Sequence, residues 1–215
     1  ETMSKKIKTV LLFGAPGSGK GTQGKLLGTL PGFVHVACGE VFRAIDLTSE
    51  VGKVFMKYSS KGELVPDDFT VRLWQEHIGK LVKHGGLKPD TDSLVLDGIP
   101  RNVHQAEMLD EHIEVIKLIW LRGIHDREEI VRRLKTRALR DNRLDDANED
   151  TIRARLKVYD EESKPVIQFY PVEVRVDVDA LQPPVAVAHD VLSAVLGRKD
   201  ELHPVKPLEL ASTKR

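Results

Sequence analysis

The sequence is poor in cysteine and carries no net charge. Its 215 residues include one cysteine, Cys38, which excludes an intrachain disulfide and a zinc site built from thiolates. Lysine plus arginine and aspartate plus glutamate number 33 each, so no overall field attracts nucleic acid or a membrane surface. We therefore expect no nucleic-acid partner, and any anion binding must depend on local groups of basic residues.

Long apolar runs are also missing. No stretch of about 18 apolar residues occurs, which argues against a membrane-spanning helix. The first residues of the chain lack the apolar core of a secretory signal. From these absences we expect a cytoplasmic protein with no membrane partner. The length suits one domain, with room for inserted lobes.

What the sequence does contain is a glycine-rich loop between a strand and a helix. An apolar run before the loop predicts a buried strand, and a helical pattern begins near Lys20. Gly14, Gly19 and Lys20 have the spacing of a phosphate-binding loop, whose backbone N–H groups and lysine bind phosphate oxygens. Gly21 stands where Ser or Thr is usual, and Thr22 follows it. A plain turn is the alternative, but the flanking strand and helix favour a nucleotide-phosphate site.

Apolar runs and helical patterns alternate along the chain. Strands are predicted over 8–13, 33–37, 93–97, 115–121 and 171–178. Helices are predicted over 20–30, 39–44, 51–60, 103–109, 126–138, 149–162 and 184–196, with a longer one that starts at 66–68. This order predicts an α/β fold, a five-stranded parallel sheet covered by helices on both faces. The polar segment from residue 198 predicts a loosely attached extension.

A second motif, Asp97-Gly98-Ile99-Pro100-Arg101, follows the third predicted strand. Its side chains emerge at the carboxyl end of that strand, where open α/β sheets bind their ligands. Asp97 is suited there to hold a hydrated Mg²⁺, and Pro100 fixes the turn that directs Arg101. A strand-to-helix turn with a capping aspartate is the alternative, and it loses weight beside a phosphate loop.

The second half of the chain carries a group of arginines. Arg133 and Arg137 are four residues apart and share one face of a predicted helix. Arg155 lies on the inward stripe that Ile152 begins, where an unpaired charge is unfavourable and an anion is needed. Arg143 lies in the polar loop between these helices. A solvated, salt-bridged face for the first pair and a structural ion pair for Arg155 remain alternatives.

Taken together, these motifs resemble the adenylate kinase family. The resemblance is carried by segments 14–23, 39–43, 62–67 and 97–101, by Arg133 and Arg137, and by Arg143, Asp145, Asp146 and Arg155. They follow the family's order over about residues 7–197, and the Gly21-Thr22 form of the loop resembles the family's own. The resemblance implies a P-loop NTPase fold with an inserted lobe for the nucleoside monophosphate and a short lid.

The resemblance also implies a division of the chain. A single domain would span 1–197, with its core in 7–37, 66–138 and 149–197. The monophosphate-binding lobe would be 38–65, the lid 139–148, and the C-terminal extension 198–215. Asp145 and Asp146 would belong to the hinge beside the lid. The zinc cysteines of long lids do not occur, so a zinc-free lid is expected.

The implied activity is transfer of the terminal phosphoryl group of ATP to AMP, giving two ADP, by a monomeric, Mg²⁺-dependent enzyme. The ATP-binding residues would be Gly17, Ser18, Gly19, Lys20, Gly21, Thr22, Arg133 and Arg137. The AMP-binding residues would be Cys38, Arg43, Ser59, Glu63, Leu64, Val65, Gly98, Arg101, Gln105, Arg143 and Arg155. The catalytic group would be Lys20, Arg101, Arg137, Arg143 and Arg155. Mg²⁺ would bind through water near Thr22 and Asp97.

Two positions favour different acceptor bases. Cys38 stands where adenylate kinases usually carry Thr and uridylate/cytidylate kinases often carry Ala, whereas Gln105 stands where pyrimidine monophosphate kinases tend to carry Asn. A UMP/CMP or broad-specificity kinase is therefore the alternative within the fold. Outside it, the alternative is a non-catalytic nucleotide sensor that signals through 198–215. The arginines placed for transfer favour the enzyme.

Overall fold

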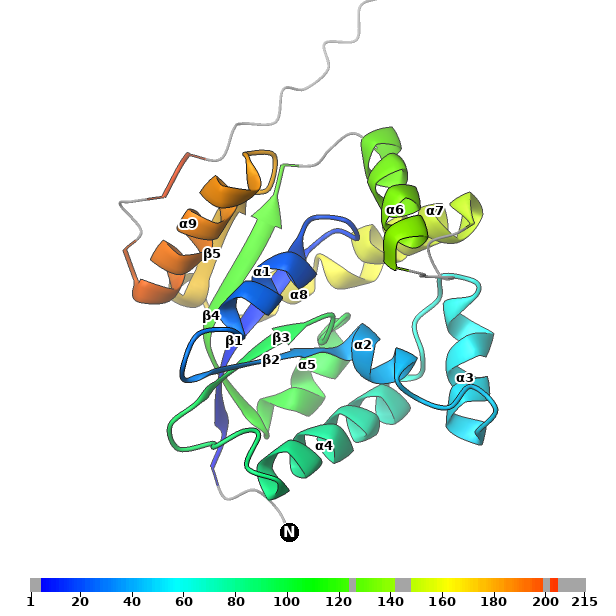
Figure 1. Cartoon of the computed structure of the whole chain (residues 1–215), viewed down its shortest axis with the longest axis horizontal. Helices are drawn as coiled ribbons and strands as arrows, with labels where there is room; N and C mark the ends of the chain where they lie inside the picture. The colour runs from blue at the N-terminus through cyan, green and yellow to red at the C-terminus, as the bar shows by residue number, and fades with distance from the viewer. Residues whose placement is uncertain (1–4, 124–126, 142–147, 199–201, 205–215) are drawn as a thin grey trace, which may run out of the picture.

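Five parallel strands form one sheet in the order β2-β3-β1-β4-β5 (Figure 1). The computed structural model describes residues 5–123, 127–141, 148–198 and 202–204. The strands are β1 (Ile7–Gly14), β2 (Phe33–Ala37), β3 (Ser93–Asp97), β4 (Ile113–Arg122) and β5 (Arg175–Asp179). The predicted parallel five-stranded sheet is confirmed.

Helices cover both faces of the sheet. They are α1 (Lys20–Leu27), α2 (Cys38–Arg43), α3 (Glu50–Ser59), α4 (Asp67–Lys83), α5 (Val103–Asp110), α6 (Arg127–Asp141), α7 (Glu149–Val158), α8 (Val166–Phe169) and α9 (Pro184–Leu196). Because side chains alternate along a strand, Leu11 and Phe13 of β1 join the core under α4 and α5, whereas Val10 and Leu12 join the core under α1 and α9. Within the described residues, the helices are too short or too polar to cross a membrane.

The strand order reverses at β1, and this reversal positions the site. From β1 the chain first builds β2 and β3 on one side and then β4 and β5 on the other. Connections therefore leave β1 in opposite directions and open a crevice at its carboxyl end, where ligands of such sheets bind. The segments α3 and α6–α7 lie on the side of the molecule opposite α9 (Figure 1). Helices α6 and α7 pack on each other through a small core of their own that includes Leu134 and Ile152.

The helix predicted over 149–162 is wrong at its end. Helix α7 stops at Val158, and a π-helical turn (Tyr159–Ser163) follows, in which the N–H of Lys164 donates to the carbonyl of Tyr159 at 3.0 Å. Tyr159 and Ser163, the first and last residues of this turn, are both buried. A regular 3.6-residue pattern does not reveal such an insertion.

Other boundaries also differ from the prediction. The strand predicted over 171–178 begins later, because β5 pairs with β4 only from Arg175 onward and a 3₁₀ turn (Val172–Val174) precedes it. The loop predicted over 139–148 also begins later, because α6 continues through Asp141; residues 142–147 lie outside the described residues. The four-residue α8 was not predicted, since its apolar run is too short to show a period.

The C-terminal extension is attached where the structure describes it, so the prediction of a loose segment is wrong at 202–204. Leu202 packs against the core under α9. The fully buried carboxylate of Asp190 on α9 is 2.7 Å from Nδ1 of His203 and accepts a hydrogen bond from the N–H of the same residue. A buried carboxylate needs such partners, and the extension supplies two of them.

Candidate functional site

The loop after β1 folds around the start of α1. Gly19, the N-cap of α1, has φ 97°, a left-handed conformation that favours glycine. The Lys20 ammonium donates to the carbonyl oxygens of Gly14 at 2.8 Å and Ala15 at 3.0 Å, so it lies against the loop itself. Ser18 is buried within the loop, at 5% exposure, and its hydroxyl is enclosed by the protein.

Lys20 lies in a strongly positive environment. Burial, with smaller contributions from Arg101, Arg137 and Arg155, lowers the pKa of its ammonium to about 8, while Asp97 acts in the opposite direction. A partly buried cation surrounded by other cations is destabilised until an anion approaches. The site therefore favours a highly charged anion such as a nucleotide polyphosphate.

The Asp97–Arg101 motif lies beside this loop. A Cβ on Gly21 would be 3.6 Å from Oδ2 of Asp97, so the carboxylate lies next to the start of α1. The peptide bond between Ile99 and Pro100 is cis. The guanidinium of Arg101 donates through Nε to the carbonyl of Gly98 at 2.9 Å. The backbone carbonyl of Arg101 accepts a hydrogen bond from the hydroxyl of Ser163 at 2.7 Å, so the π-helical turn holds this arginine in place.

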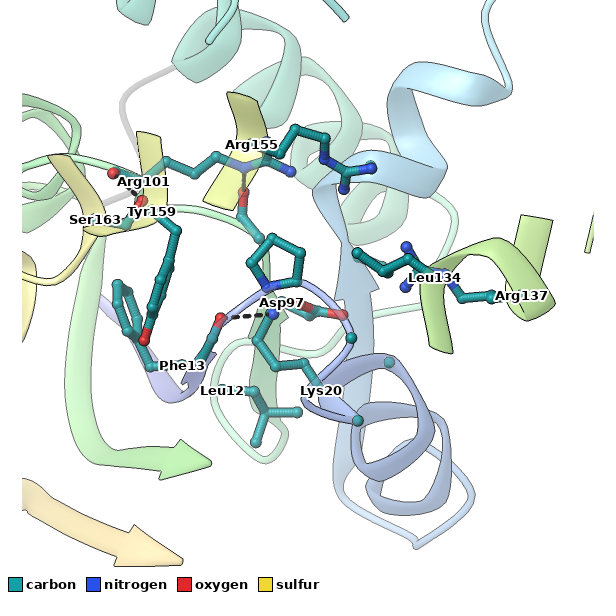
Figure 2. A pocket seen from close by; sticks show the side chains of 18 of the residues that line it. Leu12, Phe13, Lys20, Asp97, Arg101, Leu134, Arg137, Arg155, Tyr159 and Ser163 are labelled. Atoms are coloured by element: carbon teal, nitrogen blue, oxygen red, sulfur yellow. Dashed lines mark hydrogen bonds between the residues drawn. The ribbon is translucent and has the colours of Figure 1, made fainter. Parts of the chain in front are cut away.

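These groups line a cleft of about 880 Å³. Arg101, Arg137 and Arg155 come from three separate segments and surround the region of Lys20 and Asp97 (Figure 2). Of the residues predicted to bind ATP, all but Ser18 line this cleft. Arg133 lies on the exposed face of α6, where its Nε donates to Glu129 at 2.8 Å.

A smaller cavity of about 60 Å³ adjoins the cleft. It is lined by every described residue predicted to bind AMP, namely Cys38, Arg43, Ser59, Glu63, Leu64, Val65, Gly98, Arg101, Gln105 and Arg155. Arg43, Arg101 and Arg155 line both the cleft and the cavity. A ligand in the smaller cavity and a polyphosphate in the cleft would therefore share these three cations.

The inner wall of the cavity contains one amide and one thiol. The side chain of Gln105 is 1% exposed; its Oε1 accepts from the N–H of Arg101 at 2.8 Å, and its Nε2 donates to Asp67 at 2.7 Å. Burial raises the pKa of Cys38 to about 11, so the thiol is neutral at physiological pH. The cavity thus offers a fixed amide and a neutral sulfur to a ligand.

Some candidates fall outside this description, and others were missed. Arg143, with the hinge residues Asp145 and Asp146, lies outside the described residues. From the sequence, Asp67 is expected at the start of a helix and at the end of the segment 62–67, but neither Asp67 nor Ser163 is assigned a role in the site. Both contact the site through partners far away in the chain, so no local spacing could have revealed them.

Comparison with known proteins agrees with this geometry. The family model described as adenylate kinase matches residues 12–174. The chain belongs to the adenylate kinase family.

Curated relatives extend the match over most of the chain. An adenylate kinase of Thermobifida fusca is 38% identical over 194 residues, covering 88% of this chain and 98% of the relative. An adenylate kinase of Porphyromonas gingivalis is 39% identical over 166 residues, covering 75% and 81%. Adenylate kinase 1 of a Synechocystis strain is 37% identical over 185 residues, covering 84% and 93%. Membership of this family confirms the predicted nucleotide-binding phosphotransferase and its P-loop fold.

Proposed function

We propose that this protein is an adenylate kinase that transfers the terminal phosphoryl group of MgATP to AMP, reversibly giving two ADP. The observation that carries the proposal is the sharing of Arg43, Arg101 and Arg155 between the phosphate-loop cleft and the smaller cavity. Two phosphate-bearing ligands in these spaces would meet at the shared arginines, as direct transfer between them requires. Nucleotide homeostasis is the cellular role that such a reaction serves.

The chemistry needs no general base. A phosphate monoester has its second pKa at about 6, so AMP is mostly a dianion at neutral pH and is already a nucleophile. What the transfer needs is in-line positioning and compensation of charge on the transferred group. Arginines suit this role because they stay protonated and can bind two phosphate oxygens at once.

Each part of the site has a role in this proposal. Lys20 and the loop amides hold the phosphates of ATP, and Arg133 lies against its base. Arg43 and Arg101 hold the phosphate of AMP, and Gln105 contacts its base. The transferring group is compensated by Arg137 and Arg155, together with Arg143, which lies outside the described residues.

The residues near the loop also fit a magnesium ion. Asp97 presents carboxylate oxygens next to the start of α1, and the exposed Thr22 adds a hydroxyl from that helix. Hard oxygen donors of this kind suit Mg²⁺, which retains several of its waters. The ion would neutralise charge on the ATP phosphates. We expect Asp97 to hold it through water and Thr22 to lie close to it.

The finer organisation remains part of the proposal. The residues 38–65 would close over AMP and 139–148 would act as the lid, so that closure excludes the water that otherwise hydrolyses ATP. We expect a monomeric, cytoplasmic enzyme without zinc. Light scattering of the purified chain tests the monomer, and sedimentation of labelled protein after cell fractionation tests the location.

The acceptor profile tests the function. MgATP is supplied with AMP, CMP, UMP or GMP, and ADP formation is followed in a coupled assay. We expect AMP to give the highest kcat/KM. Faster phosphorylation of CMP or UMP would instead support the pyrimidine kinase, for which Cys38 is the supporting residue. Nucleotide binding without turnover of any acceptor would support the sensor.

Replacing Arg155 tests whether this residue serves catalysis rather than stability. We expect Arg155→Ala to lower kcat by about 10²-fold or more, because a charge that compensates the transferring group is lost, with a smaller effect on the thermal midpoint. Arg153→Ala is a matched control on the same helix, because Arg153 is exposed and pairs with Glu128 and Glu149 rather than lining the cleft. Full activity of Arg155→Ala would contradict the assigned role.

A further inference from the structure

The buried Gln105 amide is held by a half-buried network that begins at the start of α4. Its Nε2 donates to Oδ1 of Asp67 at 2.7 Å, and its Oε1 accepts from the N–H of Arg101 at 2.8 Å. Asn102 donates from Nδ2 to both oxygens of Asp67, at 3.0 and 3.1 Å. Oδ1 of the same Asn102 accepts from the N–H of Gln105 at 2.8 Å. The amide is therefore hydrogen-bonded at both ends before any ligand arrives.

The partners of this amide fix its orientation. A backbone N–H can only donate and a carboxylate can only accept. Rotating the amide by half a turn would place its NH₂ against the N–H of Arg101 and its oxygen against the carboxylate of Asp67. Both contacts would be repulsive. Because Gln105 is only 1% exposed, water could not relieve them. The assignment of oxygen and nitrogen in Gln105 thus follows from its partners.

The fixed amide keeps one donor and one acceptor for a ligand. Its NH₂ has a second N–H, and its oxygen has a second lone pair. A 6-amino purine offers a donor at its exocyclic nitrogen and an acceptor at N1, whereas a 6-oxo purine offers an acceptor and a donor at the same places. A freely rotating amide could match either pattern. An amide held in one orientation matches only one of them when the base is held in one position.

We propose that Asp67 is a specificity-determining positioning residue, which fixes Gln105 in the orientation that accepts a 6-amino purine and rejects a 6-oxo purine. The proposal rests on the proposed function, because it takes the smaller cavity as the site of the acceptor base. Asp67 is not one of the described residues that line the smaller cavity, so it acts on the base only through Gln105. The neighbouring Cys38 thiol is a weak donor and a weak acceptor, and it does not impose the opposite preference.

The test compares AMP with inosine 5′-monophosphate as acceptors, with MgATP as donor, in wild-type protein and in Asp67→Asn. In the wild type we expect kcat/KM for AMP to exceed that for the inosine nucleotide by at least about 10²-fold. An asparagine at position 67 can either donate or accept, so it removes one of the two contacts that fix the Gln105 amide and leaves only the N–H of Arg101 to oppose its rotation. We expect the preference to fall by about 10- to 100-fold, through a higher KM for AMP and a higher kcat/KM for the inosine nucleotide.

A matched control lies one residue away. Asp68 is an exposed carboxylate in the same first turn of α4, so Asp68→Asn removes the same charge from the same helix end. We expect its acceptor preference to equal that of the wild type. Asp67→Glu keeps an acceptor-only group and should retain the preference; it serves as the rescue variant and carries the test if Asp67→Asn does not fold.

The outcomes separate this proposal from the proposed function. Active wild-type protein whose preference is unchanged in Asp67→Asn overturns the role of Asp67 and leaves the kinase assignment intact. Wild-type protein that uses both acceptors within about tenfold overturns the selection by Gln105. Protein that binds nucleotide but phosphorylates neither acceptor overturns the proposed function, and this inference with it.

Discussion

In the smaller cavity, called the acceptor end because it is proposed to hold AMP, Gln105 is 1% exposed and both ends of its amide are hydrogen-bonded. In the cleft, called the donor end because it is proposed to hold ATP, Arg133 lies instead on the surface of α6 and pairs with Glu129 one turn away. The two ends therefore respond differently to a wrong base. A mismatch against a buried network leaves polar groups unpaired, but a mismatch at an exposed arginine can be compensated by water. Base selectivity should reside at the acceptor end, and the donor end should mainly hold phosphates.

Replacing Lys20, which is proposed to hold the phosphates of ATP, is the strongest test of the donor end. We expect Lys20→Met to lower kcat/KM by about 10²- to 10³-fold for every donor base alike, since the lost contact is to phosphate. Lys80→Met, on the exposed surface of α4, is the control and should behave as the wild type. If the loss of kcat/KM in Lys20→Met differed between donor bases, the donor end would also select the base, contrary to the comparison with the acceptor end.

The same variant has a defined effect on stability. Because burial lowers the pKa of Lys20 to about 8, the ionised ammonium is a cost to the nucleotide-free fold below that pH. Between pH 8 and the usual lysine pKa of about 10.4, the unfolded chain binds the extra proton, so wild-type stability rises with pH there. Thermal midpoints without nucleotide should therefore rise in the wild type relative to Lys20→Met above about pH 8. An unchanged difference would contradict this.

Gly62 lies where the acceptor side contacts the arginine-bearing α7. Its φ is 75°, and a Cβ there would lie 2.7 Å from the carbonyl oxygen of Thr151 and 3.1 Å from Cγ of Arg155. We expect Gly62→Ala to lower the free energy of unfolding by about 1–3 kcal/mol and to lower kcat, because both backbone strain and displacement of Arg155 follow.

Gly85 provides the matched control for Gly62. It has φ 73°, but no atom lies within 4 Å of a Cβ placed there. Gly85→Ala therefore carries the backbone strain without the collision. Denaturant unfolding and steady-state kinetics should show a smaller loss of stability and normal activity in this variant. Equal losses in the two variants would mean that the contact with α7 is unimportant.

Donor selectivity is the direct measure of the comparison. With AMP as acceptor, we expect GTP to replace ATP within about tenfold in kcat/KM, in contrast to the larger discrimination at the acceptor. Arg133→Gln should raise the KM of both donors by a similar, several-fold factor, because an exposed contact contributes about 1 kcal/mol or less. A donor preference greater than the acceptor preference would reverse our interpretation of the two ends.

The smallest effect on activity is expected from replacing Asp190, which lies outside both the cleft and the smaller cavity. Burial would raise the pKa of this carboxyl group, but hydrogen bonds from Gln182, His203 and His189 outweigh it and hold the pKa below its ordinary value. Stability from these bonds is therefore present above the unfolded pKa of about 3.9 and is lost as the pH falls through the folded value. Thermal midpoints of Asp190→Asn and wild type should differ at neutral pH and converge below about pH 4. Altered kcat or acceptor preference in this variant would contradict a purely structural attachment of the extension.

The sequence by itself determined the fold class and most of the site. Alternating apolar runs identify five strands, and the buried β3 ends at Asp97 as predicted, because strand period and glycine or proline boundaries are local properties. The spacing of Gly14, Gly19 and Lys20 likewise reflects local geometry, a strand followed directly by a glycine-rich loop and a helix. These features need only neighbours in the chain, so they were accessible without a structure.

Only the tertiary structure decided how the site is held. The bond between Gln105 and Asp67 spans 38 residues and that between Ser163 and Arg101 spans 62, so no local pattern encodes either. The π-helical turn at Tyr159 and the attachment of His203 to Asp190 also arise from contacts between distant segments. Sequence specifies which groups can bind a nucleotide, whereas their orientation depends on partners that only folding brings together.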